Sequence, residues 1–259
     1  MVDAASDHGR KRIRAVQSTL DIISALKERN GAGVTELARE VGVSKGTVHN
    51  HLVTLEENGY VVKDENDTYH LGLKFLDVAH AVQSEIPVLD LVQAEVDKLA
   101  EDSGELALFT VEEHGVGVCL HVAYGENAVQ TPIHVGYRSD LHHTAVGKAI
   151  LAHLPRERVE EIIARRGLPE ITEHTITDEE ELFENLEEIE EQGYALNEEE
   201  SIHGLVGVGA PVKNQDGTIL GALSIIGPNS RLDDERLHHE LPEMLARSVN
   251  IIEVNSTSL

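Results

Sequence analysis

The chain has 259 residues, a single cysteine and a formal net charge of −26. That length allows two ordinary domains, and the lone Cys119 excludes an intramolecular disulfide and any cysteine-based zinc cluster, so we expect a reducing, cytoplasmic setting. No apolar run approaches the roughly 18 residues of a membrane-spanning helix and the N-terminus has no signal-type apolar segment, so we expect no membrane partner.

The acidic surplus is confined to the C-terminal part of the chain. Residues 1–62 carry 8 Lys/Arg and 8 Asp/Glu, whereas residues 63–259 carry 13 and 39. Acids scattered over a whole domain, with few lysines between them, indicate a solvated surface adapted to molar salt, and we expect a halophilic source. The balanced N-terminal part would not be repelled by phosphates, so it is the candidate nucleic-acid-binding part.

A basic cluster opens this balanced part, and we expect it to contact DNA phosphates. Its members are Arg10, Lys11, Arg12 and Arg14. An amphipathic helix follows, with apolar residues at helical spacing from Ala15 to Leu26. The pair Asn30-Gly31 is a usual helix stop, so we expect the first helix to end there.

Residues 35–59 predict a second and a third helix joined by a tight turn. Gly42 breaks the helical spacing of the second helix, and Ser44 is a natural N-cap for the third. Apolar residues recur at i, i+4 and i+7 from Val48, which buries one stripe of the third helix and turns polar residues outward. Recognition helices meet base edges with their first turns. The residues expected to contact DNA are therefore Ser44, Lys45, Gly46, Thr47, His49 and Asn50.

Two short strands at residues 60–62 and 68–71 follow directly, with a polar turn between them, and complete a winged helix-turn-helix. Helical periodicity then continues over residues 71–82. The alternative interpretation of the helical pair is an ordinary helical hairpin in a globular core. We predict a DNA-binding domain at 10–71, a linker helix at 72–86 and a second domain at 87–259.

The second domain mixes strands and helices in an order that indicates an α+β fold with a mostly antiparallel sheet. Helices are expected at 89–99, 144–154, 157–166 and 233–254, and an acidic helix ending near Gly193 is expected to begin with a capping box of Thr177 and Glu180. Strands are expected at 105–111, 116–123, 128–133, 194–197, 205–212 and 218–226.

Three ordered motifs carry a resemblance to a known family. Ser44–Val61 is SKGTVHNHLVTLEENGYV, His142–Ala152 is HHTAVGKAILA, and Asn197–Pro228 is NEEESIHGLVGVGAPVKNQDGTILGALSIIGP. In this order they resemble the recognition helix, the HxTxxGKAxLA motif and the C-terminal block of the IclR family of transcription regulators, named for the isocitrate lyase regulator. The resemblance runs from about residue 13 to the end. It implies a winged helix-turn-helix followed by a GAF-like α/β effector-binding domain.

The resemblance also implies a pocket for a small carboxylate or a sugar acid. Ala145, Val146 and Gly147 open a helix with small residues, so its free backbone N–H groups could bind an anion there. Two positions, Asn197 and Ile226, stand where some family members have more polar residues, which makes this pocket less polar. For each Gly and Ala the alternative role is close packing of helix on sheet. The expected lining is Ala145, Val146, Gly147, Asn197, Leu205, Gly207, Ser224 and Ile226.

No enzyme signature accompanies these motifs, because the chain has no phosphate-binding glycine loop, no GxSxG elbow and no Cys–His arrangement. His49 and His51 lie two apart on a helix and cannot share a metal. The pairs His142–His143 and His238–His239 lack a third ligand nearby, so hydrogen-bonding or surface roles are expected. We predict no catalytic residues, no metal and no cofactor.

We therefore predict a transcription regulator that binds double-stranded DNA and a small-molecule effector. A single recognition helix covers few base pairs, so we expect a dimer or a pair of dimers on a palindromic operator. One alternative is a GAF-like sensor or enzyme whose N-terminal helices serve assembly, and another is an effector domain that has lost its ligand and only drives oligomerisation. DNA binding explains the neutral N-terminal part, whereas assembly alone does not.

Overall fold

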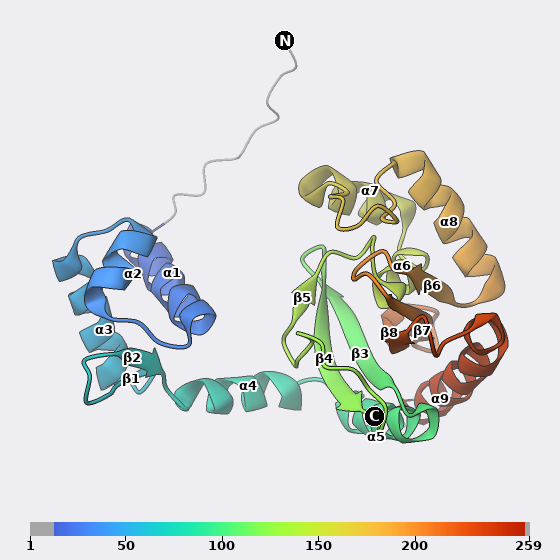
Figure 1. Ribbon diagram of the computed structural model, residues 1–259, viewed down its shortest axis with the longest axis horizontal. Coiled ribbons are helices and arrows are strands. Elements are labelled where there is room, and N and C mark those ends of the chain that lie inside the picture. The colour runs from blue at the N-terminus through green and yellow to red at the C-terminus, as the bar shows by residue number, and fades with distance from the viewer. Residues whose placement is uncertain (1–12, 257–259) are drawn as a thin grey trace, which may run out of the picture. The chain divides into compact units, whose positions relative to one another are not determined.

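The computed structural model describes residues 13–256, and the chain divides into two compact units with the boundary between Glu85 and Ile86 (Figure 1). The predicted phosphate contacts Arg10, Lys11 and Arg12 lie outside the described residues. Among the helices of residues 13–256, none is long and apolar enough to cross a membrane.

The first unit is a winged helix-turn-helix. Its elements are α1 (Arg14–Arg29), α2 (Val34–Val41), α3 (Lys45–Glu57), β1 (Val61–Lys63), β2 (Tyr69–Leu71) and α4 (Lys74–Ser84). Gly42 adopts a left-handed conformation with φ of 74°, which allows the sharp turn between α2 and α3. The Ser44 side chain caps α3 by accepting a hydrogen bond of 3.1 Å from the Thr47 N–H. The predicted pair of helices and its wing are confirmed.

A small core holds this unit together. Ile22 of α1, Leu37 of α2 and Leu52 of α3 have no exposed surface and pack in one apolar cluster. Tyr69 of β2 closes the cluster from the wing, and an isolated bridge between Ala32 and Tyr69 joins the turn after α1 to that strand. Since the outward residues of α3 take no part in this core, they are free for other contacts.

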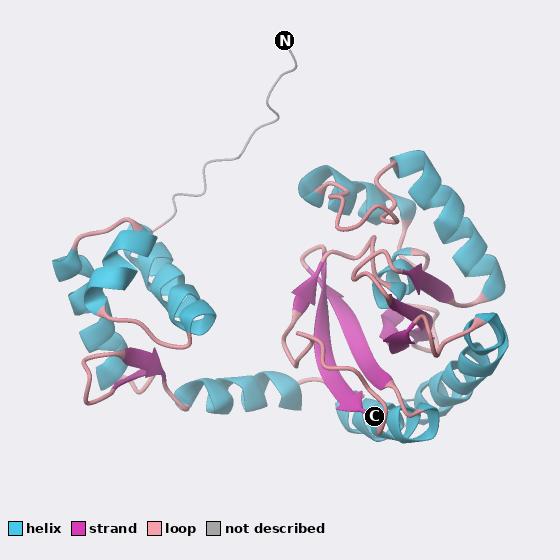
Figure 2. Cartoon of the chain, in the orientation of Figure 1, coloured by secondary structure: helices cyan, strands magenta, loops and turns pink. Residues whose placement is uncertain are grey.

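The second unit has an α+β fold, as predicted (Figure 2). Its elements are α5 (Leu89–Ser103), β3 (Leu106–Glu113), β4 (Val116–Tyr124), β5 (Arg138–Ser139), α6 (Ala145–Leu151), α7 (Arg156–Arg166), α8 (Glu179–Gln192), β6 (Ala195–Glu198), β7 (Leu205–Lys213), β8 (Ile219–Pro228), the π-helical turn η1 (Arg236–Glu240) and α9 (Leu241–Ser256). One six-stranded sheet runs in the order β5-β4-β3-β8-β7-β6, and every neighbouring pair is antiparallel.

Helices cover both faces of this sheet, so each face has its own apolar core. On one face, residues such as Val96 of α5 and Leu245 of α9 pack against Phe109 and Leu223 of the sheet. The helices α6, α7 and α8 share the second core, which contains the fully buried Leu182. Figure 1 shows α7 and α8 beyond α6 on this second side.

Helix α6 lies directly on strand β7, with no side chain between them at Gly209. A Cβ atom at Gly209 would come within 2.6 Å of the Ala145 carbonyl carbon, closer than real Cβ contacts. At the same helix, a Cβ at Gly147 would come within 2.1 Å of the Leu141 carbonyl oxygen. These two glycines therefore set the position of the first turn of α6 against the sheet.

Three predicted elements need correction. The strand expected at 128–133 is absent, because this segment contains Pro132, which cannot donate to a ladder, and the sheet edge is instead the short β5. The acidic helix is capped by Asp178 and not by Thr177: one carboxylate oxygen of Asp178 accepts from both the Glu180 and the Glu181 N–H. The final helix is not uniform, since Pro242 cannot bond back to residue 238 and a π-helical turn precedes α9.

Candidate functional site

The first turns of α3 present a polar surface. Lys45, Gly46, His49 and Asn50 are exposed, while Thr47 is half-buried and bonded to Ser44 at 2.8 Å between their hydroxyls. The side chains of Lys45, His49 and Asn50 have no hydrogen-bond or ion-pair partner within residues 13–256. Such free donors and acceptors at the start of a helix are what reading base edges requires.

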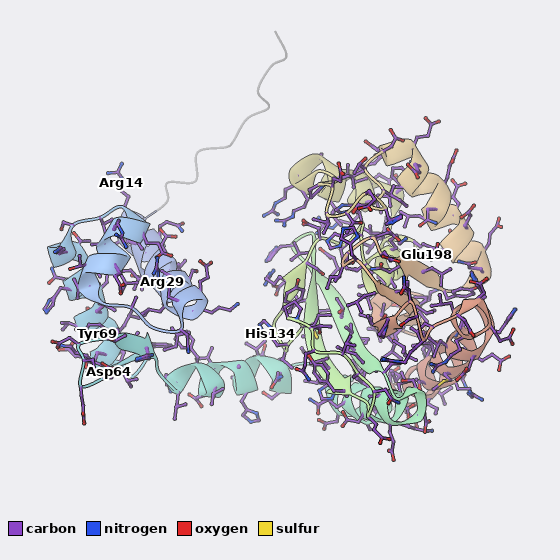
Figure 3. All side chains as sticks on the ribbon, in the orientation of Figure 1. Arg14, Arg29, Asp64, Tyr69, His134 and Glu198 are labelled. Atoms are coloured by element: carbon purple, nitrogen blue, oxygen red, sulfur yellow. The ribbon has the colours of Figure 1, made fainter. Side chains whose placement is uncertain are left out.

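Ion pairs occupy three of the seven Lys and Arg side chains in the described part of the first unit. Arg29, Lys63 and Lys74 each form an ion pair, with Glu40, Asp67 and Asp77 respectively. The cations without an ion-pair partner in the described part of this unit are Arg14, Lys27, Arg39 and Lys45. Figure 3 shows Arg14 extending outward from its unit.

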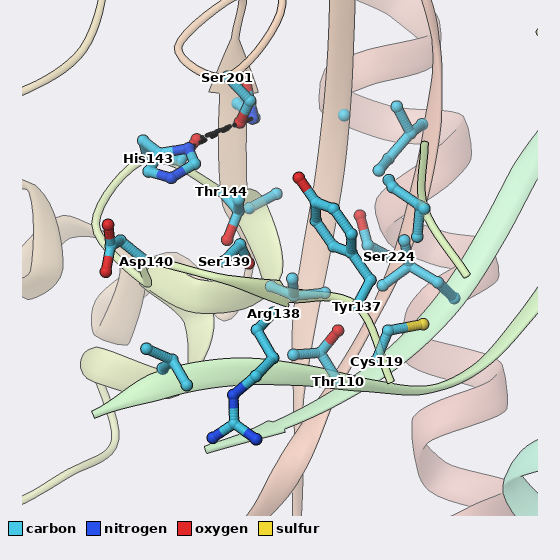
Figure 4. Close-up of a pocket in the computed structure, with 18 of the residues that line it drawn as sticks. Thr110, Cys119, Tyr137, Arg138, Ser139, Asp140, His143, Thr144, Ser201 and Ser224 are labelled. Atoms are coloured by element: carbon cyan, nitrogen blue, oxygen red, sulfur yellow. Dashed lines mark hydrogen bonds between the residues drawn. The ribbon is translucent and has the colours of Figure 1, made fainter. Parts of the chain in front are cut away.

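The second unit contains a cavity of about 560 Å³ beside α6 and the sheet (Figure 4). Of the eight residues expected to line a ligand pocket, seven line this cavity. They are Ala145, Val146, Asn197, Leu205, Gly207, Ser224 and Ile226. Gly147 does not line it, since its Cα faces Leu141. For Gly147, the alternative of close packing is the correct one.

Two hydrogen-bond donors among the residues of the expected site are already occupied. The Gly147 N–H donates to the Thr144 side chain at 3.0 Å, which leaves the N–H groups of Ala145 and Val146 as the unbonded ones of this turn within the described chain. The Ser224 hydroxyl donates to the Val208 carbonyl at 2.7 Å. Ser224 therefore cannot donate its proton to a ligand as well.

The side chain of Lys148, the next residue of α6, does not line the cavity. It is buried and forms an ion pair of 2.5 Å with the buried Glu200. The second carboxylate oxygen of Glu200 has no hydrogen-bond partner in residues 13–256. Lys148 thus holds the segment after β6 against α6 and offers no free positive charge to a ligand.

A buried polar network forms one wall of the cavity. Asn197 donates to the His143 carbonyl at 3.0 Å and to the Ser201 hydroxyl at 2.7 Å, and accepts from the Glu200 N–H at 3.0 Å. The Nδ1 atom of His143 lies 3.1 Å from the Ser201 hydroxyl (Figure 4). Because Asn197 has used both donors and its oxygen internally, its first role is to hold this wall.

His143 and Ser201 are among the lining residues that the sequence did not predict, and they are the two that form a polar contact in the wall. Their separation of 58 positions hides the contact, and the only sequence signal was the adjacent pair His142–His143, for which a hydrogen-bonding role was expected. Both histidines are buried, with His142 bonded to the Pro169 carbonyl at 3.0 Å. The expected hydrogen-bonding role is confirmed, and the surface role is wrong for this pair.

Burial shifts the pKa values of two side chains in the cavity wall. It lowers the pKa of His143 to about 4, with His142 and Lys148 acting in the same direction and Asp140 in the opposite one. It also raises the pKa of the Cys119 thiol to about 12. At neutral pH the cavity therefore presents an uncharged imidazole and an uncharged thiol.

Positive charge is confined to the rim of the cavity. Arg138 pairs with Glu113 at 3.0 Å and Arg166 with Asp140 at 2.7 Å, whereas the exposed Arg165 has no ion-pair partner in the described chain. The side chains of Ile171 and Ile202, 47% and 39% exposed, also line the cavity. No group of three His, Cys, Asp or Glu side chains among residues 13–256 could hold a metal ion.

Two family models match the chain. Residues 15–65 match the IclR helix-turn-helix domain, and residues 80–253 match the bacterial transcriptional regulator IclR C-terminal domain. Among curated relatives, a probable HTH-type transcriptional regulator ArcR of Halobacterium salinarum is 34% identical over 97% of each chain.

Solved structures agree with these matches. The crystal structure of the Thermotoga maritima IclR has a TM-score of 0.79 and 25% identity, and the alignment covers 94% of this chain and 99% of that one. The inducer-binding domain of an Acinetobacter PobR double mutant, solved as a complex with 3-hydroxybenzoic acid, has a TM-score of 0.59 and 26% identity, over 63% of this chain and 96% of that one.

The lowered pKa of His143 predicts how stability depends on pH. Between pH 6.5 and 4 the unfolded chain binds a proton at this residue that the folded chain does not, so the free energy of unfolding falls as pH falls through this window. The expected loss is roughly 3 kcal/mol by pH 4. Urea denaturation of the full chain and of His143→Asn between pH 8 and 4.5 measures it, and the variant should lose less stability than the parent. Equal losses in the two proteins would contradict the prediction.

Proposed function

The chain belongs to the IclR family of transcription regulators and is a DNA-binding regulator of that type, and we propose that a small organic acid in the cavity of its second unit changes its affinity for DNA. The observation that carries this proposal is the cavity itself. It combines a partly open, mainly apolar interior with an unpaired arginine at the rim.

The cavity chemistry favours an acid with an apolar body over a polyhydroxylated sugar acid. Its apolar lining includes Leu108, Val116, Val146 and Ile226, whereas Asn197 and Ser224 have already used their donors within the protein. The apolar part of the lining is larger than the polar part, so an apolar ligand body would bury more surface here than a polyhydroxylated one. The Acinetobacter domain solved with 3-hydroxybenzoic acid supports the same class.

A carboxylate has one preferred place at this cavity. Arg165 is the rim arginine without an ion-pair partner in the described chain, so a carboxylate there would gain a charge-assisted hydrogen bond and break none. The unbonded N–H groups of Ala145 and Val146 offer neutral donors in the wall. We propose that the cavity binds a ligand and catalyses no reaction. Since the partner of the protein is DNA, we also propose that it acts in the cytoplasm.

On DNA, we propose that the first turns of α3 read bases while Arg14 and the preceding Arg10, Lys11 and Arg12 contact phosphates. Lys45 and Asn50 are free and exposed on α3. Because three cations of this unit are already paired, the DNA contacts should fall to its free side chains, including Lys45 and Asn50 on α3.

Replacement of either α3 side chain should weaken operator binding without unfolding the protein. We expect Lys45→Ala and Asn50→Ala each to reduce operator affinity about 5- to 150-fold, the effect of losing one good base contact. Fluorescence anisotropy with labelled operator DNA measures this. Lys98→Ala is the matched control, since it removes an exposed lysine from the second unit. If both α3 variants bind like this control, α3 is not the reader.

We further propose that two copies associate through apolar residues of the first unit, which would place two α3 helices on a palindromic operator. Ile13, which caps α1, and Val16 and Leu20 within it are exposed at i, i+3 and i+7. No residue of α4 is buried, and Leu76 and Val82 on it are 66% and 59% exposed. A chain with exposed apolar side chains on both helices has a reason to cover them with its own copy.

A charge on α4 tests this association. Leu76→Asp should raise the dissociation constant of the dimer at least about tenfold, because an aspartate would be buried without a partner in the interface. Sedimentation velocity at several protein concentrations measures it. Val62→Asp, at a 52% exposed position of the wing, is the control and should leave the assembly unchanged. An unaltered dimer in Leu76→Asp would contradict the proposed interface.

Filling the cavity should uncouple DNA binding from the effector. In the parent we expect an active organic acid to change operator affinity about 5- to 150-fold, the usual range for coupled sites. Ile226→Trp fills part of the cavity and should abolish this change while leaving ligand-free DNA binding intact. Val254→Trp adds the same bulk at an exposed position of α9 and should respond like the parent. A response that survives in Ile226→Trp would refute a sensing role for this cavity.

A further inference from the structure

His143 occupies the second, unspecified position of the HxTxxGKAxLA motif and lines the cavity. Its ring has one nitrogen bonded inside the protein and one that is not. Nδ1 lies 3.1 Å from the Ser201 hydroxyl, whereas Nε2 makes no hydrogen bond within residues 13–256 and is not among the buried unpaired atoms. Figure 4 shows this second nitrogen on the side of the ring away from Ser201.

The surrounding bonds decide which ring nitrogen carries the proton. The Glu200 N–H donates to the Asn197 side-chain oxygen, which fixes the orientation of that amide. The Asn197 nitrogen must then be the donor to both the Ser201 hydroxyl oxygen and the His143 carbonyl. Ser201 consequently accepts one hydrogen bond from Asn197 and has one lone pair left.

The single proton of Ser201 is also assigned. The Ser201 hydroxyl oxygen and the His143 carbonyl oxygen are so close that they would repel each other without a proton between them, so Ser201 donates to that carbonyl. Ser201 has no second proton for Nδ1. The contact between them is attractive only if Nδ1 carries the hydrogen and donates it to the remaining lone pair of Ser201.

The imidazole is therefore held as the Nδ1–H tautomer, which leaves Nε2 as a hydrogen-bond acceptor without a proton. We propose that His143 Nε2 accepts a hydrogen bond from a hydroxyl group of the effector, so that hydroxy acids are selected over acids that lack a donor at this position. The inference rests on the proposed sensing function and narrows its ligand class. Asn197 and Ser201 act as positioning residues.

This acceptor also discriminates against other groups. A second carboxylate or an ether oxygen facing Nε2 would bring two acceptors together, and both would lose their hydration without gaining a partner. The imidazole stays neutral at pH 7 because of its burial, which lowers its pKa, so it offers no positive charge to a second carboxylate. In this proposal, Arg165 at the rim recognises the carboxylate of the ligand, and His143 in the wall recognises its hydroxyl group.

The tautomer can be measured without any ligand. In the full-length protein labelled with ¹⁵N-histidine, the long-range ¹H–¹⁵N spectrum at pH 7 should show Nδ1 protonated and Nε2 unprotonated for His143. The signals are assigned by their loss in His143→Asn. A protonated Nε2 would overturn the inference.

Ligand selection is tested with matched acids. Calorimetry on the full-length protein would compare 3-hydroxybenzoate, 3-methoxybenzoate and benzoate, and in parallel 3-hydroxybutyrate, 3-methoxybutyrate and butyrate. In at least one set, the hydroxy acid should bind about 3- to 10-fold more tightly than its methyl ether and its deoxy analogue, the effect of one hydrogen bond. Equal affinities within every set that binds would overturn the inference.

Two substitutions of His143 separate its two nitrogens. In His143→Asn the amide nitrogen can replace Nδ1 as donor to Ser201 but nothing replaces Nε2, so the preference for the hydroxy acid should disappear. In His143→Gln the longer side chain can place its oxygen near the Nε2 position, so part of the preference should return. Ser201→Ala, which removes the partner that fixes the tautomer, should reduce the preference without abolishing binding of the deoxy acids.

The outcomes distinguish this inference from the function on which it rests. If the acids bind and alter operator affinity but the hydroxy preference is absent, or is unchanged in His143→Asn, the inference is wrong and the sensing function stands. If no acid of either set binds to the parent, the proposed organic-acid effector fails, and the selection by His143 fails with it.

Discussion

The wall of the cavity depends on a buried ion pair between Lys148 and Glu200. Two charges so far from water are tolerated only when they compensate each other, and here the ammonium and carboxylate groups lie 2.5 Å apart. The pair fixes Glu200, whose N–H orients Asn197, and Asn197 in turn holds Ser201 and the carbonyl of His143. Helix α6 is thereby tied to the segment after β6, and the cavity lies against both.

Close backbone packing determines where this wall stands. Gly147 and Gly209 leave no room for a Cβ atom, so α6 rests on Leu141 on one side and on β7 on the other. The motif that suggested an anion site at the start of α6 is thus largely a packing motif: its glycine is a spacer, its lysine is an internal counter-ion, and its threonine is the helix cap. A ligand can therefore use the cavity beside α6 and the unbonded N–H groups of Ala145 and Val146, the first two residues of that helix.

The sequence predicts those parts of the fold that depend on interactions between residues close together in the chain. Caps, glycine stops and apolar periodicity are local, so α1 to α3, the wing and the central strands were predictable from Ser44, Gly42 and similar signals. Strand pairing is not local, and the segment 128–133 looked like a strand but lacks a ladder. The same limit applies to the site: its lining could be carried over by resemblance, whereas the contact of His143 with Ser201 arises only when segments 58 positions apart meet.

We propose that the exposed helix α4 links assembly, DNA binding and sensing. None of its residues is buried, and Leu76, Val78 and Val82 are exposed, so its sequence does not explain its stability in one isolated copy. An interface with a second copy would supply the missing burial at the point where the chain passes from the DNA-binding unit to the cavity-bearing unit. A helix whose stability depends on that interface has two alternative states, with and without its partner contacts, and coupling between distant sites requires an element of this kind. In this proposal, an effector that favours one state of α4 would alter DNA affinity without contacting α3.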